Sequence, residues 1–136
     1  MPKKSILFAA RWAVLCALVL PTVVEAGEVA RAVFSTGVEN HEPVDSITSV
    51  PATVGNVYFF TELRGMQNQT VTHRWEYQGR VMAEVSFHVD GPRWRVWSSK
   101  RLLPGWSGRW TVSVVDGAGE VVATKGMDYG EGAPFP

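Results

Sequence analysis

Strict alternation of apolar and polar side chains near the middle of the chain limits most strongly what this sequence can fold into. The apolar positions are Val81, Ala83, Val85, Phe87 and Val89, and the residues between them are Met82, Glu84, Ser86 and His88. A repeat of two places the apolar set on one face of a β-strand. After residue 26, no stretch carries the 3.6-residue repeat of an amphipathic helix. The sequence therefore predicts an all-β domain whose strands are buried on one face.

Short strand-like segments, separated by turn residues, fill the rest of the chain. The predicted strands are residues 29–34, 56–63, 71–77, 81–89, 93–98, 109–114 and 120–127. Gly, Pro, Asn and Asp lie between them, and Pro104-Gly105 suits a type II turn. About seven short strands predict an Ig-like or fibronectin-like β-sandwich, with no room for helical crossovers. The expected core residues are Phe59, Trp75, Val85, Phe87, Trp94, Trp110, Val112 and Val114.

The first 26 residues have the pattern of a secretory signal peptide. Three basic residues precede an uncharged apolar run at residues 12–20, Pro21 ends that run, and small residues lead up to Ala26. The run is shorter than the roughly 20 residues of a membrane-spanning helix. We expect a signal peptide at residues 1–26, one β-domain at 27–128 and a flexible tail at 129–136. Cleavage after Ala26 and retention as an anchor both stay open.

Charge and cysteine content narrow the range of functions. The chain has 13 Lys+Arg and 13 Asp+Glu, so its formal net charge of 0 excludes a basic nucleic-acid binder and an acidic disordered chain. Cys16 is the single cysteine and lies in the predicted signal peptide. The exported chain would then have no disulfide and no thiolate metal site. We expect no metal and no redox cofactor, and a periplasmic or extracellular location.

The residues suited to catalysis do not form a recognisable pattern. His41, His73 and His88 lack the spacing of a metal site, and His41-Glu42 alone is too little to define one. His73 shares the inward face of its strand with a tryptophan, which favours a hydrogen-bonded core histidine. Ser98 and Ser99 lack a nucleophile-elbow context. Glu62, Glu76 and Glu84 are expected to be solvated strand residues. We therefore expect no enzyme activity.

Tryptophan and arginine concentrate between residues 74 and 110. Alternation along RWRVWSSKR (residues 93–101) points Trp94 inward and Arg93, Arg95 and Trp97 outward. Two interpretations stay open: a ladder of guanidiniums stacked on indoles that stiffens the sheet, or a contact surface rich in Trp and Arg. Pro104-Gly105 is expected to raise Trp106 to a loop tip. The candidate binding residues are Arg74, Arg93, Arg95, Trp97, Lys100, Arg101, Trp106 and Arg109.

Three strings of the sequence resemble a bacterial protein family. HRWEYQG (residues 73–79), GPRWRVWSSKRLLPGWSGRWTV (91–112) and VVDGAGEVV (114–122) are similar to the domain of unknown function 2914, DUF2914. Residues 34–39 and 60–63 resemble its longer members, so the likeness extends over about residues 33–128. Gly105 is the one departure from the pattern. The resemblance implies an envelope-exposed, sandwich-like bacterial module and carries no catalytic residues.

These observations lead to one expected function and one alternative. We expect a non-catalytic, exported envelope module that binds a protein, a glycan or another anionic envelope partner through its Trp/Arg-rich surface. The alternative is a structural or assembly component of the envelope in which the Trp/Arg ladder only stabilises the fold. Neither nucleic acid as a partner nor a transmembrane helix in the mature chain is expected. The partner's identity and the oligomeric state stay open.

Overall fold

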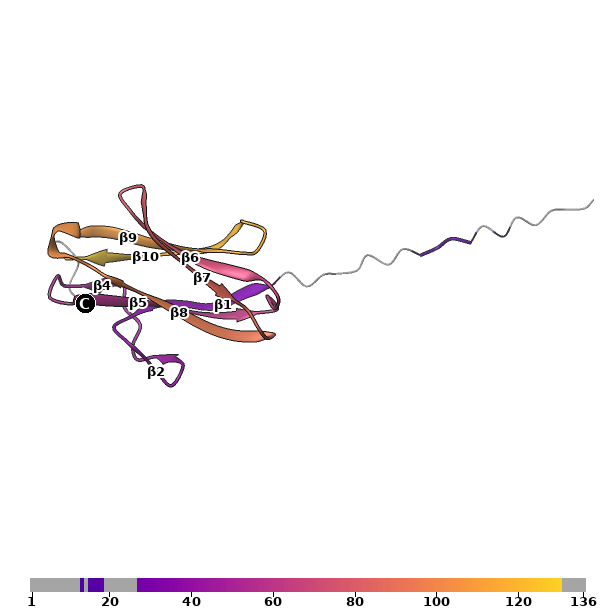
Figure 1. Ribbon diagram of the computed structural model, residues 1–136, viewed down its shortest axis with the longest axis horizontal. Helices are drawn as coiled ribbons and strands as arrows, with labels where there is room; N and C mark the ends of the chain where they lie inside the picture. Colours follow the sequence, from indigo (N-terminus) through magenta and orange to yellow (C-terminus); the bar gives the residue numbers. More distant parts are fainter. Residues whose placement is uncertain (1–12, 14, 19–26, 131–136) are drawn as a thin grey trace, which may run out of the picture.

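The computed structural model describes residues 13, 15–18 and 27–130, and residues 27–130 form an all-β domain (Figure 1). Its long strands, each of eight or nine residues, are β1 (Glu28–Ser35), β5 (Asn56–Arg64), β6 (Thr70–Tyr77), β7 (Arg80–His88), β8 (Arg93–Arg101), β9 (Gly108–Val115) and β10 (Val121–Tyr129). Short elements are β2 (Val38–Glu39), β3 (Glu42–Pro43), β4 (Ser49–Val50) and the 3-10 turn η1 (Pro104–Trp106). The predicted all-β class is confirmed, and all seven predicted strands are present.

Two sheets face each other across the core (Figure 1). The three-stranded sheet has the order β1-β5-β8, and the five-stranded sheet has the order β4-β10-β9-β6-β7. Neighbouring strands are antiparallel except β4 and β10, which are parallel. The hairpin of β2 and β3 lies outside the three-stranded sheet, on the side away from the core (Figure 1).

The core between the sheets contains most of the residues that alternation assigned to it. The fully buried ones among the eight expected are Phe59, Trp75, Trp110, Val112 and Val114. Phe87 and Trp94 are half-buried and pack against this core. Val85 is half-buried and lies outside the core cluster, because β7 is the last strand of its sheet.

Strand β7 departs from the predicted alternation near its start. Trp75 pairs with Ala83 and Glu76 with Val81, so Met82 is an extra residue that forms a β-bulge. The bulge reverses the two faces: Val81 is 54% exposed, whereas Met82 packs against the core. The expectation that Val81 faces inward is therefore wrong.

A chain of buried hydrogen bonds joins the two sheets. The indole Nε1 of Trp75, on β6, donates to Ser98 Oγ on β8 over 3.0 Å. His73, also on β6, places Nδ1 2.8 Å from the same Oγ and Nε2 2.9 Å from Thr61 Oγ1 on β5. Thr61 in turn donates to the carbonyl of Val96 over 3.3 Å. The predicted core histidine is confirmed.

The direction of this chain assigns the tautomer of His73. Thr61 donates its one hydroxyl proton to the Val96 carbonyl, so it accepts from His73, and Nε2 carries the proton of the ring. Ser98 Oγ accepts the indole N–H and donates its own proton to Nδ1, the remaining acceptor that it contacts. The imidazole is therefore neutral, and its burial lowers the pKa of His73 to about 3.

The end of the domain lies slightly beyond the predicted boundary at residue 128. Tyr129 is the last residue of β10, is buried, and donates its hydroxyl proton to the carbonyl of Leu102 over 3.1 Å. Gly130 donates its N–H to the carbonyl of Val50. The rest of the predicted tail and nearly all of the predicted signal peptide lie outside the described residues. Across residues 13, 15–18 and 27–130, no helix has the length and hydrophobicity that crossing a bilayer requires.

The Ser98 hydroxyl should contribute much more to the free energy of unfolding than the hydroxyl of Ser99. Ser98→Ala leaves the Trp75 N–H and His73 Nδ1 without a partner, at a cost of about 1–3 kcal/mol for each buried group. Ser99→Ala removes an exposed hydroxyl and should stay within about 0.5 kcal/mol of wild type. Urea unfolding at neutral pH measures both. Equal losses would show that the chain of hydrogen bonds is not what holds the sheets.

Burial of neutral His73 should make the fold sensitive to mild acid. The unfolded chain takes up a proton on this residue below its ordinary pKa of 6.5, whereas the folded chain does so only near 3. Stability should be complete above pH 6.5 and fall by about 1.4 kcal/mol per pH unit below it. Urea midpoints between about pH 7.5 and 5 test this slope. His73→Phe should flatten the slope, whereas His88→Asn, which removes an exposed imidazole, should preserve it.

Candidate functional site

The outer face of the three-stranded sheet collects most of the candidate side chains. Alternation along β8 turns Arg93, Arg95, Trp97, Ser99 and Arg101 to this face, because Val96 and Ser98 point into the core. On the neighbouring strand β5, the outward residues include Phe60 and Glu62, both buried although they face away from the core. The side chains that cover them form the candidate site.

Glu62 is the centre of an arginine cluster. Its carboxylate accepts hydrogen bonds from Arg93 at 2.8 and 3.1 Å, from Arg64 at 3.0 and 3.2 Å, and from Arg31 at 3.2 Å. Burial by itself raises the pKa of Glu62, but the hydrogen bonds from the three arginines outweigh burial and lower it. The carboxylate is therefore ionised, and it fixes the positions of three guanidiniums.

The β2–β3 hairpin supplies a second carboxylate. Glu42 accepts hydrogen bonds from Arg31 at 2.7 and 2.9 Å and from Arg95 at 2.7 Å, so the hairpin is tied across the sheet from β1 to β8. These bonds lower the pKa of Glu42 to about 2. At the hairpin turn, Asn40 and His41 have φ of 52° and 60°, as a two-residue type I′ turn requires. The His41 ring meets Trp97 edge-on at 5.4 Å.

A cleft opens between this hairpin and β8. It has a volume of about 290 Å³ and is lined by His41, Arg93, Trp94, Arg95 and Trp97. The Trp97 indole is half-buried and stacks beside Phe60 at a ring distance of 6.5 Å. The arginines of the cluster (Arg31, Arg64, Arg93 and Arg95) outnumber its carboxylates (Glu42 and Glu62) by two. The cleft therefore combines indole surface with a surplus of positive charge.

The eight candidate binding residues do not share one surface. Arg93, Arg95, Trp97 and Arg101 lie on the outer face of the three-stranded sheet. Arg74 and Arg109 lie on the outer face of the opposite sheet, where they pair with Glu84 at 3.0 Å and Asp128 at 3.5 Å. Lys100 and Trp106 meet at the end of the domain beside η1, with the Lys100 ammonium 5.0 Å from the indole centroid.

Trp106 does not stand at a loop tip, and that expectation is wrong. Pro104–Trp106 forms a 3-10 turn in place of the type II turn, and the indole folds back to lie 6.0 Å from the Trp110 ring. The Trp106 carbonyl accepts the indole proton of Trp110 over 2.9 Å. Since Trp110 is buried, its N–H needs a partner inside the fold, and the turn supplies one.

Sequence reasoning missed the carboxylates of the site. Glu62 was expected to be solvated but is 3% exposed. Its position gives one signal: it alternates on β5 with Phe60, an aromatic residue on a face that should be polar. Arg31 and Glu42 gave none, because their role depends on where the hairpin lies.

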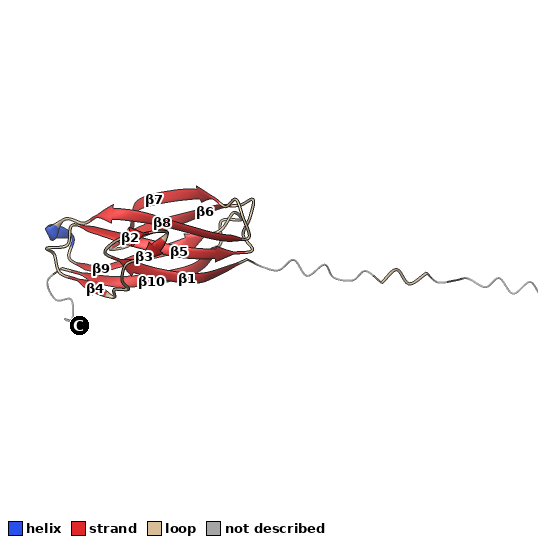
Figure 2. Ribbon diagram, turned by 90° about the horizontal axis from the view of Figure 1, so that it is seen from below, coloured by secondary structure: helices blue, strands red, loops and turns tan. Residues whose placement is uncertain are grey.

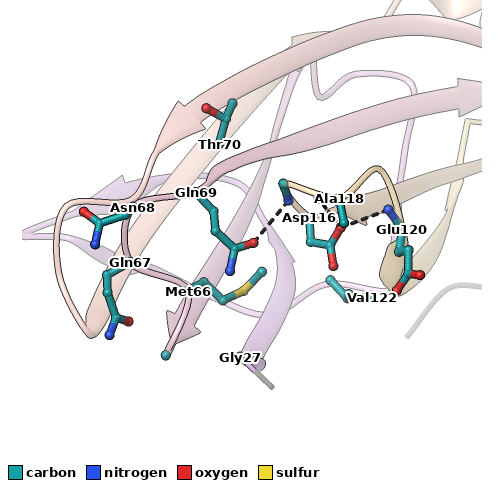
Figure 3. Close-up of a pocket in the computed structure, with 12 residues that line it drawn as sticks. Gly27, Met66, Gln67, Asn68, Gln69, Thr70, Asp116, Ala118, Glu120 and Val122 are labelled. Atoms are coloured by element: carbon teal, nitrogen blue, oxygen red, sulfur yellow. Dashed lines mark hydrogen bonds between the residues drawn. The ribbon is translucent and has the colours of Figure 1, made fainter. Parts of the chain in front are cut away.

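A second, larger groove lies at the end of the domain where β1 begins (Figure 3). Its volume is about 1030 Å³, and the β5–β6 loop and the β9–β10 hairpin form its walls. Gln69 Oε1 accepts the N–H of Gly117 over 3.2 Å, and Asp116 Oδ1 accepts the N–H groups of Ala118 and Glu120. The Gln69–Gly117 bond joins the two walls, and the two bonds to Asp116 hold the turn of the β9–β10 hairpin. None of the predicted binding residues lines this groove, and the described residues contain no cluster of three metal-ligating side chains.

The comparison with protein families confirms the resemblance over part of the chain. Residues 68–126 match the family described as Protein of unknown function (DUF2914). The match covers β6 to β9 and the first part of β10, but not residues 33–67, where the resemblance was also expected. It includes Arg93, Arg95 and Trp97 and excludes Glu42 and Glu62. No curated protein matches the chain.

Loss of the central carboxylate should destabilise the domain more than loss of an exposed one. Glu62→Gln removes the charge that gathers three guanidiniums and should cost about 1–3 kcal/mol. Glu84→Gln breaks the exposed pair with Arg74 and should cost less than about 1 kcal/mol. Both are read from urea unfolding at neutral pH. Indistinguishable losses would mean that the arginine cluster contributes no more than a surface ion pair.

Proposed function

We propose that this chain is an exported, non-catalytic module of the bacterial envelope that binds an anionic partner through the outer face of the three-stranded sheet. One observation carries the proposal: the cleft beside β8 joins two indoles to arginines that outnumber the carboxylates around them. Trp and Arg are the residues most enriched at the energetic centres of interfaces. Carboxylates or phosphates of a protein or glycan partner would meet these guanidiniums.

The arginines are held in place before any partner arrives. Glu62 and Glu42 each accept bonds from more than one guanidinium, so these side chains lose little further freedom on binding. The Arg93 Nη1 and Arg95 Nη2 groups make no hydrogen bond to other described residues and remain as donors.

We infer that the fold is an Ig-like, fibronectin-like β-sandwich. The order β1-β5-β8 opposite β10-β9-β6-β7 is similar to the two sheets of that architecture, in which successive strands cross between sheets. By analogy of fold, a role at the cell surface fits this chain, since domains of this kind serve widely as cell-surface modules.

Two further observations support the rest of the proposal. Ser98 and His73, the one serine–histidine contact among the described residues, are buried in the core, where no substrate reaches them. Export is supported by the signal-like sequence of residues 1–26.

The alternative is that the cluster only stabilises the fold. It is favoured by the ion pairs themselves, since Arg31, Arg64, Arg93 and Arg95 each bond a carboxylate of the same chain. Under this alternative the outer face has no partner, and the domain acts as a structural component of the envelope.

Charge reversal on the outer face should separate these alternatives. Arg101 is exposed on β8, so Arg101→Glu should reduce capture of the partner several-fold without changing the melting temperature. Lys125→Glu makes the same charge change on β10 of the other sheet and should leave capture unchanged. Capture is measured by crosslinking in envelope extracts and on an array of acidic and neutral glycans. The alternative is correct if neither assay detects binding, or if both variants behave alike.

A further inference from the structure

Strand β8 forms a free edge of the three-stranded sheet. It pairs with β5 along its whole length, and the sheet ends there. Among the described residues, no strand pairs with its other side, although β7 of the opposite sheet lies nearby (Figure 2). A long edge strand presents unpaired N–H and C=O groups that can accept another strand.

The register shows which backbone groups face this edge. Leu102 donates its N–H to the Gly55 carbonyl, and the Pro92 carbonyl accepts the N–H of Gly65. Both bonds continue the β5–β8 register, so the even-numbered residues of β8 direct their backbone groups to β5. The backbone groups of Arg93, Arg95, Trp97, Ser99 and Arg101 therefore point to the free edge. These are the same residues whose side chains lie on the outer face.

All the charged side chains of β8 are positive. Between Asp90 and Asp116 the chain has no acidic residue, whereas β8 alone carries Arg93, Arg95, Lys100 and Arg101. The acidic partners of the first two, Glu62 and Glu42, belong to β5 and to the hairpin, not to β8. A strand placed beside β8 would therefore meet cations and no carboxylate of β8.

The cleft follows this edge. Residues that point to opposite faces of β8 line it, with Trp94 on the inner side and Arg93, Arg95 and Trp97 on the outer side. A ligand in such a cleft reaches the backbone between these side chains as well as the side chains themselves. A single sugar ring would use the indole and the charges but is too short to pair with the whole row of peptide groups.

Resting on the binding role proposed above, we propose that the partner is an acidic, extended peptide segment that adds as a strand to the free edge of β8. Its backbone pairs with the N–H and C=O groups of the odd-numbered residues, as in β-strand addition elsewhere. Because side chains alternate, its acidic residues occupy every second position, on the outer face beside the arginines. The residues between them are apolar and face Trp94.

The experiment uses a fluorescein-labelled peptide of alternating Glu and Val with nine residues, the length of β8. Fluorescence anisotropy at low salt measures its binding to the domain. A second peptide has the same sequence with N-methyl groups on alternate amides, which removes backbone pairing and keeps the charge. A third has Lys in place of Glu. Labelled polygalacturonate, an acidic glycan, is the fourth probe.

The protein variants separate backbone pairing from charge. Ser99 is exposed and its N–H faces the free edge, so proline is tolerated there while one donor is lost. Ser99→Pro should weaken binding of the Glu–Val peptide on the order of tenfold, with polygalacturonate binding and the melting temperature nearly unchanged. Arg80→Glu, on the edge strand of the other sheet, is the control for a change of edge charge and should have no effect on either probe.

The proposal is supported if the Glu–Val peptide binds and the N-methylated and Lys peptides do not. Equal binding of the Glu–Val and N-methylated peptides overturns strand addition. Binding of polygalacturonate alone, sensitive to Arg101→Glu but not to Ser99→Pro, also overturns it and leaves the anionic binding role standing. Failure of every acidic probe overturns both.

Discussion

The hydrogen bonds through buried His73 decide how the two sheets face each other. Apolar contacts alone tolerate small shifts between layers, whereas a neutral imidazole offers one donor and one acceptor in fixed directions. Its partners, Thr61 and Ser98, come from both β5 and β8, and Trp75 completes the chain from β6. Among the described residues, no buried side-chain nitrogen or oxygen lacks a partner. A polar network that is fully paired in a low-dielectric core favours one arrangement of the layers over its neighbours.

The outer face of the three-stranded sheet is ordered by charge. Glu62 is buried there beneath the three guanidiniums that bond it, and the forked geometry of arginine lets one carboxylate pair with several of them. The ion pairs hold the arginines of the cluster in place. Because the cluster has more positive than negative charge, it still attracts anions. This combination suits binding, since ordered side chains lose little entropy when a partner arrives. The β8 edge beside the cluster presents backbone donors and acceptors that no strand of the described residues pairs with.

Much of the fold could be predicted because strand signals are local. The predicted ranges differ from the observed strands by at most three residues at either end, and the buried face of β6 followed from its alternation. The bulge at Met82 could not be predicted, since an extra residue in β7 is defined only by its pairing with β6. The folded-back Trp106 depended on the buried N–H of Trp110, which lies on a different element. The β2–β3 hairpin is too short to show a periodicity of its own.

The sequence by itself determined that the chain is built of strands, which residues of β6, β8 and β9 point inward, and that Arg93, Arg95 and Trp97 share one side of β8. These properties follow from a period of two, which a single strand displays without its neighbours. The tertiary structure decided which outward residues share a surface. Arg74 and Arg109 point outward as clearly as Arg95 does, but from the opposite sheet. It also decided that Glu62 is buried and that β8 is an edge, because burial and edge position depend on which segments, distant in sequence, lie alongside.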